Sequence, residues 1–141
     1  MVQAIATTGR KCTDDAVSLA KWAAEHAKIP YVPRANLSGQ ALRERYGVDF
    51  ILIAKQGLLT LSTPAGDLFF HPNMAHLRLK NLRFGSAGTG DRMVEAMGLV
   101  HGMSVLDCTL GFGADAIVAS FAVGPEGKVT GIESQPLLET V

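Results

Sequence analysis

The chain has 141 residues, of which 48% are hydrophobic, and its formal net charge is zero. A chain of this length and apolar content can bury the core of one ordinary domain or of two small ones. No apolar run approaches the roughly 20 residues that cross a bilayer, and the first residues lack the pattern of a signal peptide. We therefore expect a soluble, cytoplasmic protein without a membrane partner.

The zero net charge conceals an uneven distribution along the chain. Residues 1–90 hold 11 Lys and Arg against 6 Asp and Glu, whereas residues 91–141 hold 2 against 7, so the two parts carry +5 and −5. A basic segment suits a polyanion such as RNA, because each cation near a phosphate releases a counterion. Lysines and arginines also cover the surfaces of proteins that bind no nucleic acid. Charge alone leaves both interpretations open.

The cysteines and histidines do not form a metal-binding pattern. Cys12 and Cys108 lie far apart and lack CxxC spacing, which argues against a zinc site and against a disulfide framework. His71 and His76 are five residues apart in a stretch that we expect to be irregular. We therefore expect no metal, and we interpret these histidines as surface or capping side chains.

Residues 2–34 predict a parallel βαβ unit. The apolar segment 2–6 predicts a strand, residues 13–27 predict a helix, and "PYVPR" at 30–34 predicts a second strand. Thr13 is a suitable N-cap, and the apolar residues of the helix recur on one face.

Residues 38–70 predict the remaining elements of a small α/β domain. A helix is expected over 38–46 and ends at Gly47, and "VDFILIA" then predicts a buried strand. The turn "KQG" leads into a strand at "LLTLS", and "DLFF" predicts another short strand. We place this first domain, a candidate for RNA binding, at residues 1–66.

A basic, glycine-rich junction is expected at residues 67–90. No acidic residue lies between Asp67 and Asp91, while Arg78, Lys80 and Arg83 are close in sequence. The segment "GSAGTG" supplies a flexible link, and "DRMVEAMGL" then predicts a helix whose methionines face a core.

Residues 103–133 predict a nucleoside-binding βαβ unit. The segment "MSVLDC" predicts a buried strand, "TLGFG" a loop, and "ADAIVASFAV" a helix. Gly111 and Gly113 allow a ligand to approach the backbone at the start of that helix. The next strand, "VTGIE", ends on Glu133, and an acid at this place can accept hydrogen bonds from both hydroxyls of a ribose.

Two nucleoside cofactors fit this loop. Gly111, Gly113 and Ala116 satisfy the G-x-G-x-x-G/A pattern of NAD-binding proteins. Asp107 favours S-adenosylmethionine, because its carboxylate would repel a pyrophosphate but tolerates the sulfonium and ammonium groups of S-adenosylmethionine. A third interpretation, in which the glycines merely tighten a turn, also stays open.

These residues resemble class I S-adenosylmethionine-dependent methyltransferases, whose first motif is an apolar strand, an acid and a G-x-G loop. The segments "HPNMAHLRLKNLRFGSAGTGDRMVEAMGL", "VLDCTLGFGADAIVAS" and "GIESQPLLE" are similar to bacterial small-subunit ribosomal RNA guanine-N2 methyltransferases. The Glu-Arg-Ser-Pro motif of that family is Glu133-Ser134-Gln135-Pro136 here, so the arginine is absent and the serine is shifted. The resemblance covers residues 67–141. It implies an α/β fold in which the small N-terminal domain precedes the first part of a Rossmann-like methyltransferase domain at 91–141.

The resemblance also implies a cofactor, a substrate and site residues. The cofactor is S-adenosylmethionine, and the substrate is RNA, with guanine N2 as the methylated atom. The implied cofactor-binding residues are Asp107, Gly111, Gly113, Asp115, Glu133 and Ser134. The residues implied to lie near the substrate are Arg78, Lys80 and Arg83, with the "GSAGTG" loop. The catalytic residues are expected beyond Val141, so we expect the 141-residue chain to be inactive alone and to self-associate through an exposed strand edge.

The N-terminal segment supports a second hypothesis. The stretch "ATTGRKCTDDAVSLAKWAAEHAKIPYVPR" resembles, at its start, the "TTSRKPS" opening of the RNA-binding domain of Brix-type ribosome-assembly proteins. The whole chain resembles a group of methyltransferases from Gram-positive bacteria that share this N-terminal extension. An RNA-binding or ribosome-assembly module without catalysis is therefore one alternative to a methyltransferase, and an NAD-binding Rossmann protein is the other.

Overall fold

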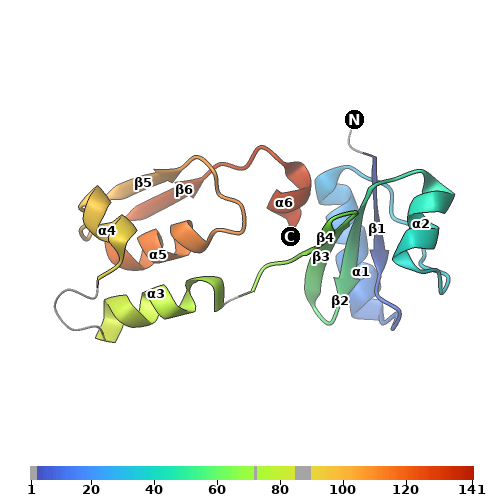
Figure 1. Cartoon of the computed structure of the whole chain (residues 1–141), viewed down its shortest axis with the longest axis horizontal. Helices are drawn as coiled ribbons and strands as arrows, with labels where there is room; N and C mark the ends of the chain where they lie inside the picture. The colour runs from blue at the N-terminus through green and yellow to red at the C-terminus, as the bar shows by residue number, and fades with distance from the viewer. Residues whose placement is uncertain (1–2, 72, 85–89) are drawn as a thin grey trace. The chain divides into compact units, whose positions relative to one another are not determined.

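The computed structural model describes residues 3–71, 73–84 and 90–141, which form two compact units. The first unit contains the residues up to Phe70 together with Gln135–Val141, and the second contains His71–Ser134. The elements of the first unit are β1 (Ala4–Thr8), α1 (Asp14–Ala27), α2 (Gly39–Tyr46), β2 (Phe50–Lys55), β3 (Leu58–Thr63), β4 (Gly66–Leu68) and α6 (Pro136–Thr140). Those of the second are α3 (Asn73–Phe84), α4 (Arg92–Met97), β5 (Ser104–Asp107), α5 (Ala114–Val123) and β6 (Lys128–Gly131), as labelled in Figure 1.

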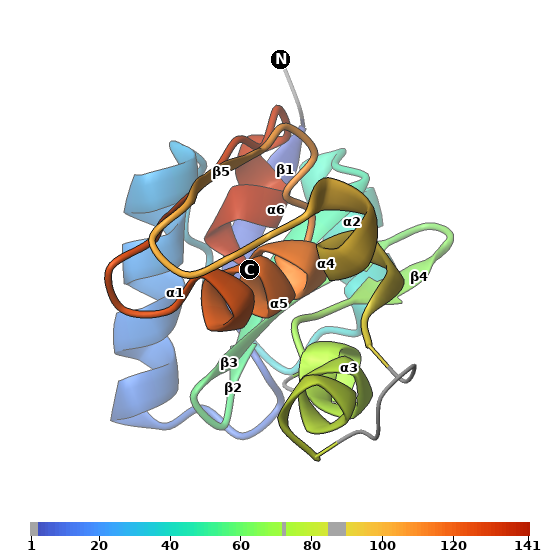
Figure 2. The same cartoon turned by 90° about the vertical axis from the view of Figure 1, so that its left-hand side faces the viewer.

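The first unit is a four-stranded sheet with helices on both faces. The strand order is β1-β2-β3-β4, with β1 parallel to β2 and the other pairs antiparallel. Side chains alternate between the faces of a strand, so Ala4 and Ala6 join the core under α1, whereas Ile5 joins the core under α2. Figure 2 shows α1 and α2 on opposite sides of these strands.

Helix α1 forms as the sequence predicted. The Thr13 hydroxyl caps it by accepting a hydrogen bond from the Ala16 backbone, and Lys28 ends it in the left-handed conformation. Its buried face consists of small side chains, among them Ala20, Ala23 and Ala24. Alanines allow the helix backbone to approach the sheet closely, which matches the alanines of β1 and β2 in the same core.

The expected strand at residues 30–34 is reduced to a single bridge. Tyr31 forms an isolated parallel bridge with Ala6, and the full parallel partner of β1 is β2 instead. Pro30 and Pro33 flank Tyr31 and have no backbone N–H to donate, so the ladder cannot extend through them.

The last seven residues belong to the first unit. Helix α6 contacts α1 and β3, and Leu137 is buried in the core under α1. The sequence placed residues 135–141 in the second domain, so the structure divides the chain differently at this point. The difference arises because Leu137 of "PLLE" packs in the core of the first unit. The hydrophobic periodicity of the sequence does not show which core such a short segment joins.

The second unit has a helix layer on a two-stranded sheet. Strands β5 and β6 are parallel, with Asp107 in register with Gly131. Helix α5 contacts both strands, and α3 packs on α5; Figure 1 shows this order of layers. The strand expected in residues 103–108 is present as β5, but the expectation that it is buried is wrong, because Leu106 is 57% exposed. Strand β5 pairs with β6 and has α5 on one face, and Leu106 is exposed to solvent.

Residues 73–84 form a helix, which corrects the expectation of an irregular stretch around His76. The segment "NMAHLRLKNLRF" contains several strong helix formers and no glycine or proline. The Nδ1 atom of His71 accepts a hydrogen bond from the Asn73 backbone N–H at 3.1 Å, so His71 is a capping side chain, as expected. None of the helices in the described ranges is sufficiently long and apolar to span a bilayer.

Candidate functional site

The loop after β5 and the residues after β6 are joined by backbone hydrogen bonds. The Ile132 N–H donates to the Asp107 carbonyl at 2.8 Å, and the Leu110 N–H donates to the Ile132 carbonyl at 3.0 Å. These bonds continue the parallel ladder beyond β5 and β6. They bring the glycine loop alongside the segment that follows β6, at the carboxyl edge of both strands.

Glu133 and Gly111 meet at this edge. The Gly111 N–H donates to Oε2 of Glu133 at 2.9 Å, across 22 positions of sequence. The carboxylate predicted to bind a ribose thus lies against the glycine loop predicted to bind the same nucleoside. The structure brings Asp107, Gly111 and Glu133 together, and Ser134 follows as an exposed residue.

The loop conformation requires its glycines. Gly111 and Gly113 have φ angles of 52° and 72°, in the left-handed region that other residues rarely adopt. The Asp107 carboxylate supports the loop from its other end, because Oδ1 accepts the Thr109 N–H at 3.0 Å. Gly113 occupies the N-cap of α5 and provides no side-chain cap. The first N–H groups of α5 therefore face the loop without a side-chain acceptor from the cap residue.

Asp115 is directed to an ion-pair network rather than to the glycine loop. Arg78 of α3 pairs through Nη1 with Oδ1 of Asp115 at 2.5 Å and through Nε with Oδ2 of Asp91 at 2.6 Å. Asp91 also caps α4 by accepting the N–H groups of Met93 and Val94. Arg78 thus connects α3, the start of α4 and the start of α5.

The two carboxylates of this network differ in environment. The side chain of Asp91 is 6% exposed, that of Arg78 is 30% exposed and that of Asp115 is 65% exposed. Hydrogen bonds from Arg78 lower the pKa of Asp91 to about 2, which outweighs the effect of burial. The same bonds to Asp91 and Asp115 raise the pKa of Arg78. The positive charge of Arg78 is therefore paired with two carboxylates of the protein and is not free to bind a substrate phosphate.

Two cavities flank the glycine loop. One of about 210 Å³ is lined by Asp107, Cys108 and Asp115 together with the two methionines of α4, Met93 and Met97. The other, of about 430 Å³, lies between Leu110, the first turns of α5 and β6. A Cβ atom on Gly131 would lie 2.5 Å from Leu110 Cδ1 and would clash with it. A glycine at this position therefore leaves space for the Leu110 side chain of the loop beside β6.

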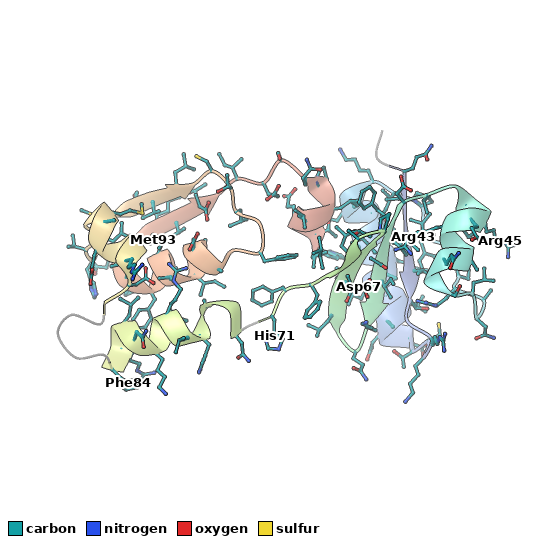
Figure 3. The ribbon with its side chains drawn as sticks, in the orientation of Figure 1. Arg43, Arg45, Asp67, His71, Phe84 and Met93 are labelled. Atoms are coloured by element: carbon teal, nitrogen blue, oxygen red, sulfur yellow. The ribbon has the colours of Figure 1, made fainter. Side chains whose placement is uncertain are left out.

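Lys80 and Arg83 lie with aromatic side chains on α3. They line a cavity of about 450 Å³ together with His76, Leu79, Phe84 and Phe121. The Arg83 guanidinium stands over the Phe84 ring at 5.1 Å, and Phe84 is 71% exposed; Figure 3 labels Phe84 at the end of its helix. Of the "GSAGTG" loop expected nearby, residues 85–89 lie outside the described residues.

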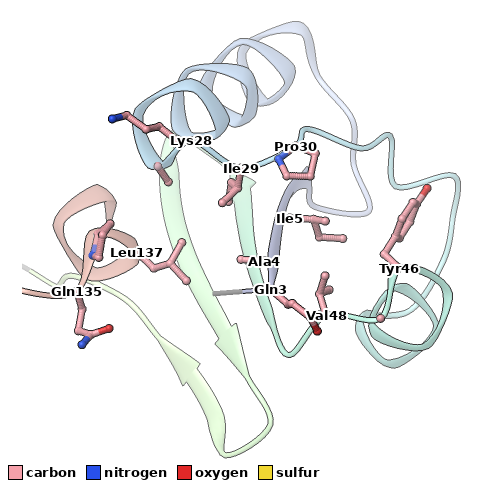
Figure 4. A pocket seen from close by; sticks show the side chains of 13 residues that line it. Gln3, Ala4, Ile5, Lys28, Ile29, Pro30, Tyr46, Val48, Gln135 and Leu137 are labelled. Carbon is pink, nitrogen blue, oxygen red and sulfur yellow. The ribbon is translucent and has the colours of Figure 1, made fainter. Parts of the chain in front are cut away.

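A further cavity lies elsewhere, in the first unit. It measures about 780 Å³ and is lined mainly by apolar side chains at the amino end of β1, including Ile5, Ile29, Val48 and Leu137 (Figure 4). Its lining among the described residues includes Lys28 and Tyr46 but neither an acid nor a histidine. The described residues also contain no cluster of three His, Cys, Asp or Glu that could hold a metal ion.

Sequence reasoning missed two features of the second unit. The role of Asp91 was missed, although an Asp directly before a predicted helix is a typical N-cap signal. The aromatic partners of Lys80 and Arg83 were missed because Phe121 lies on α5, far from α3 in sequence. No local sequence signal could show that α3 and α5 pack against each other.

The charge asymmetry disappears when it is counted by structural unit. The first unit holds eight Lys and Arg against seven Asp and Glu, and the second holds five against six. The +5 of residues 1–90 includes Arg78, Lys80 and Arg83, and these residues belong to the second unit. Net charge therefore does not single out the N-terminal unit as a binder of polyanions.

Comparisons with known proteins relate the chain to methyltransferases. Residues 85–140 match the family model described as protein-L-isoaspartate(D-aspartate) O-methyltransferase. The "Uncharacterized protein YpiP" of Bacillus subtilis (strain 168) is 33% identical over 135 residues, which cover 96% of this chain and 51% of that protein. The crystal structure of a SAM-dependent methyltransferase from Neisseria gonorrhoeae matches with a TM-score of 0.52 and 18% identity, over 97% of this chain and 48% of that chain.

The chain thus spans about half the length of the relatives it matches. The comparisons confirm the expected α/β fold class, and they support the resemblance to class I S-adenosylmethionine-dependent methyltransferases. They do not support the narrower guanine-N2 subfamily. The chain therefore shares the α/β fold of a SAM-dependent methyltransferase, and residues 85–140 match the sequence pattern of a methyltransferase family.

Proposed function

We propose that the protein is an S-adenosylmethionine-dependent methyltransferase that acts on RNA, with guanine N2 as the preferred atom. The observation that carries the proposal is the meeting of Glu133 with the left-handed glycine loop at the carboxyl edge of β5 and β6. Ligands of open α/β sheets bind at this edge. The methyltransferase family match covers the same residues.

The residues present fit the chemical groups of S-adenosylmethionine. Glu133 presents a carboxylate for the ribose hydroxyls, and the glycines leave the loop backbone open to a ligand. The carboxylate of Asp107 lines one cavity beside the loop, which favours a cationic group over a pyrophosphate, whereas the charge of Asp115 in the same cavity is paired with Arg78. This chemistry favours S-adenosylmethionine over NAD. When bound, the cofactor supplies an electrophilic methyl group, and the loop residues hold and orient it.

The surface of α3 and α5 supports RNA as the substrate class. Lys80 and Arg83 supply two cations, and the exposed rings of Phe84 and Phe121 stand beside the same cavity. Single-stranded RNA is bound by this combination, because cations follow its phosphates and aromatic rings stack on its bases. We call the surface formed by Lys80, Arg83, Phe84 and Phe121 the α3 platform. Arg78 is not part of it.

A label-transfer assay tests the proposal. The full-length protein, and not residues 1–141 alone, is incubated with methyl-tritiated S-adenosylmethionine and a mixture of total RNA and cell protein, and the two fractions are then separated. Label in RNA that comigrates with N2-methylguanosine after digestion is the expected result. Label confined to protein would contradict the RNA substrate and favour a protein carboxylate, the substrate named for the matched family. Failure to bind S-adenosylhomocysteine, measured by calorimetry, would contradict the methyltransferase itself.

The alternative function is RNA binding without catalysis. The α3 platform favours it equally, because stacking and phosphate contacts require no cofactor. RNA binding by the α3 platform, without S-adenosylhomocysteine binding and without label transfer, would establish this alternative.

A further inference from the structure

We propose that the first unit carries a second binding site, specific for a phosphate group, at the carboxyl end of β1, with Arg10 and Arg34 as its cations. The site belongs to a different unit from the glycine loop, and it does not depend on methyl transfer. The phosphate source is a mononucleotide or the backbone of RNA. The topology, a cavity and the surroundings of the two arginines support this site.

Strand β1 lies at a topological switch point. On one edge it pairs with β2, and on the other edge Ala6 exchanges hydrogen bonds with Pro30 and Val32, both at 2.9 Å. The chain reaches Tyr31 through α1, on one face of the sheet, and β2 through α2, on the other face. Both neighbours are parallel to β1. In open α/β sheets, ligands bind outside the carboxyl ends of the strands at such a point.

A cavity of about 220 Å³ lies at this place. It is lined by the loop that follows β1, including Arg10 and Cys12, and by the loop that follows Tyr31, including Arg34 and Asn36. Ala35 and Asn36 have φ angles of 47° and 62°. A left-handed conformation at two consecutive non-glycine residues costs conformational free energy. Tertiary contacts must therefore hold this loop in place.

Arg34 is held rigidly with its guanidinium at this cavity. Its Nη1 donates to the Thr8 carbonyl and its Nε donates to the Leu37 carbonyl, both at 3.0 Å. Burial and the nearby charge of Arg10 lower the pKa of Arg34. Among the described residues, neither arginine forms an ion pair with an acid. Two mutually repelling cations at one cavity lack a countercharge, and the negative charge of a phosphate group would supply it.

The neighbours of the arginines are compatible with an anion. Lys55 ends β2 next to Gly9, where a Cβ on the glycine would lie 3.0 Å from Lys55 Cβ, so the base of a third cationic side chain lies beside this loop. Thr8 lines the cavity and is 1% exposed, and its hydroxyl has no hydrogen-bond partner in the described part of the chain. Asp14 and Asp15 in the first turn of α1 oppose an anion at the helix start. The site therefore depends on the arginines and not on the helix dipole.

The two free cysteines provide a built-in test. Both are exposed; Cys12 lines the proposed phosphate site, and Cys108 lines the cavity beside Asp107 in the second unit. The alkylation rate of each thiol by iodoacetamide is measured by mass spectrometry on the full chain at constant ionic strength. The ligands are adenosine monophosphate, adenosine, and a short oligoribonucleotide without a terminal phosphate.

We expect a phosphate ligand to slow alkylation of Cys12, whereas adenosine leaves it unchanged. Protection by adenosine monophosphate identifies a terminal phosphate, and protection by the oligoribonucleotide alone identifies a backbone phosphate. Both results support the site. Protection by adenosine equal to that by its monophosphate, or no protection by either phosphate ligand, would overturn it. S-adenosylhomocysteine is expected to protect Cys108 only. The alkylation rate of Cys108 therefore tests the proposed function, independently of the phosphate site that Cys12 reports.

Arg10→Ala is the decisive variant. Arg10 is exposed, and no hydrogen bond of its side chain to another described residue is present, so the substitution should leave the fold intact. We expect the concentration of ligand needed to protect Cys12 to rise about tenfold, since charge-assisted hydrogen bonds to phosphate are lost. Arg45→Ala removes the same charge from α2, on a side chain directed away from the sheet (Figure 3), and should change protection by less than about twofold. Equal effects of the two variants would refute the site.

Discussion

The Gly111 N–H donates to Oε2 of Glu133 at 2.9 Å. This bond joins the glycine loop to the residue after β6 at the carboxyl edge of the strands, where a nucleoside would bind. A carboxylate that accepts a loop N–H is already oriented toward the glycines. The bond therefore fixes the position of the carboxylate before a ligand arrives, and it gives Glu133 a role in the conformation of the loop as well as in binding.

Glu133→Gln should separate these two roles. Glutamine retains an oxygen that can accept the Gly111 N–H, so thermal stability should change little. Affinity for S-adenosylhomocysteine should fall about tenfold, because hydrogen bonds from the ribose to a charged acceptor are replaced by bonds to a neutral one. Calorimetry measures the affinity. Glu126→Gln, at an exposed acid in the turn before β6, is the control, and an equal loss in both variants would refute the role of Glu133.

Asp91→Asn should destabilise the protein more than Asp115→Asn. Asp91 is buried, caps α4 and receives two hydrogen bonds from Arg78, so its replacement should cost about 1–3 kcal/mol. Asp115 is 65% exposed, and an exposed ion pair contributes about 0–1 kcal/mol. Urea denaturation of both variants gives the two free energies. A larger loss for Asp115→Asn would show that the network is organised around α5 and not around Asp91.

The same network should make stability depend on pH in acid. The pKa of Asp91 is about 2 in the folded protein against an ordinary value of 3.8. Because the folded value is lower, Asp91 contributes stability above pH 4 that is lost as the pH falls from about 4 to 2. The contribution is on the order of 1 kcal/mol, since solvent screens the partly exposed Arg78. Denaturation of the wild type and of Asp91→Asn between pH 6 and 2 should show a smaller loss in the variant.

The α3 platform should bind RNA through stacking and charge, and the two contributions can be measured separately. Phe84→Ala should weaken binding of a single-stranded RNA about tenfold without changing its salt dependence, because a stacked base is lost. Lys80→Ala and Arg83→Ala should each reduce the slope of log affinity against log salt by about 0.7. Arg92→Ala, at an exposed cation of α4, should leave the slope unchanged. Filter binding at several salt concentrations measures both quantities, and identical slopes in all variants would contradict the platform.

Local signals were sufficient to predict most elements and the core of the site. The helices α1 and α2 carry capping residues and glycine or left-handed ends, and the βαβ unit around Gly111 and Glu133 follows from strand, loop and helix patterns. The meeting of Asp107, Gly111 and Glu133 follows from topology alone, since the carboxyl ends of parallel strands lie at one edge. These features depend on residues that are close in sequence or joined by one crossover.

The features that could not be predicted depend on contacts between distant segments. Arg78 appeared to be a substrate-binding cation because its acidic partners, Asp91 and Asp115, lie at the starts of two other helices, α4 and α5. The helix α3 lacks the regular apolar face of an isolated amphipathic helix, so periodicity did not reveal it. The docking of α6 on α1 and β3 likewise depends on packing in three dimensions.

The exposed apolar side chains of the second unit should cause self-association of the 141-residue chain. Leu106 in β5 is 57% exposed, and Ile132 after β6 is 52% exposed. Removal of such side chains from water favours pairing with a second copy, and the backbone edges of β5 and β6 offer hydrogen bonds to it. Light scattering should therefore give a mass that exceeds 14.9 kDa and rises with protein concentration.

Leu106→Thr should reduce this association, because a polar, β-branched residue retains the strand and removes apolar surface. Leu58→Thr is a matched control, since Leu58 starts β3 in the first unit and is 56% exposed. It should leave the mass unchanged. A monomer at all concentrations, or an equal effect of the two substitutions, would show that the face of β5 and β6 does not mediate association.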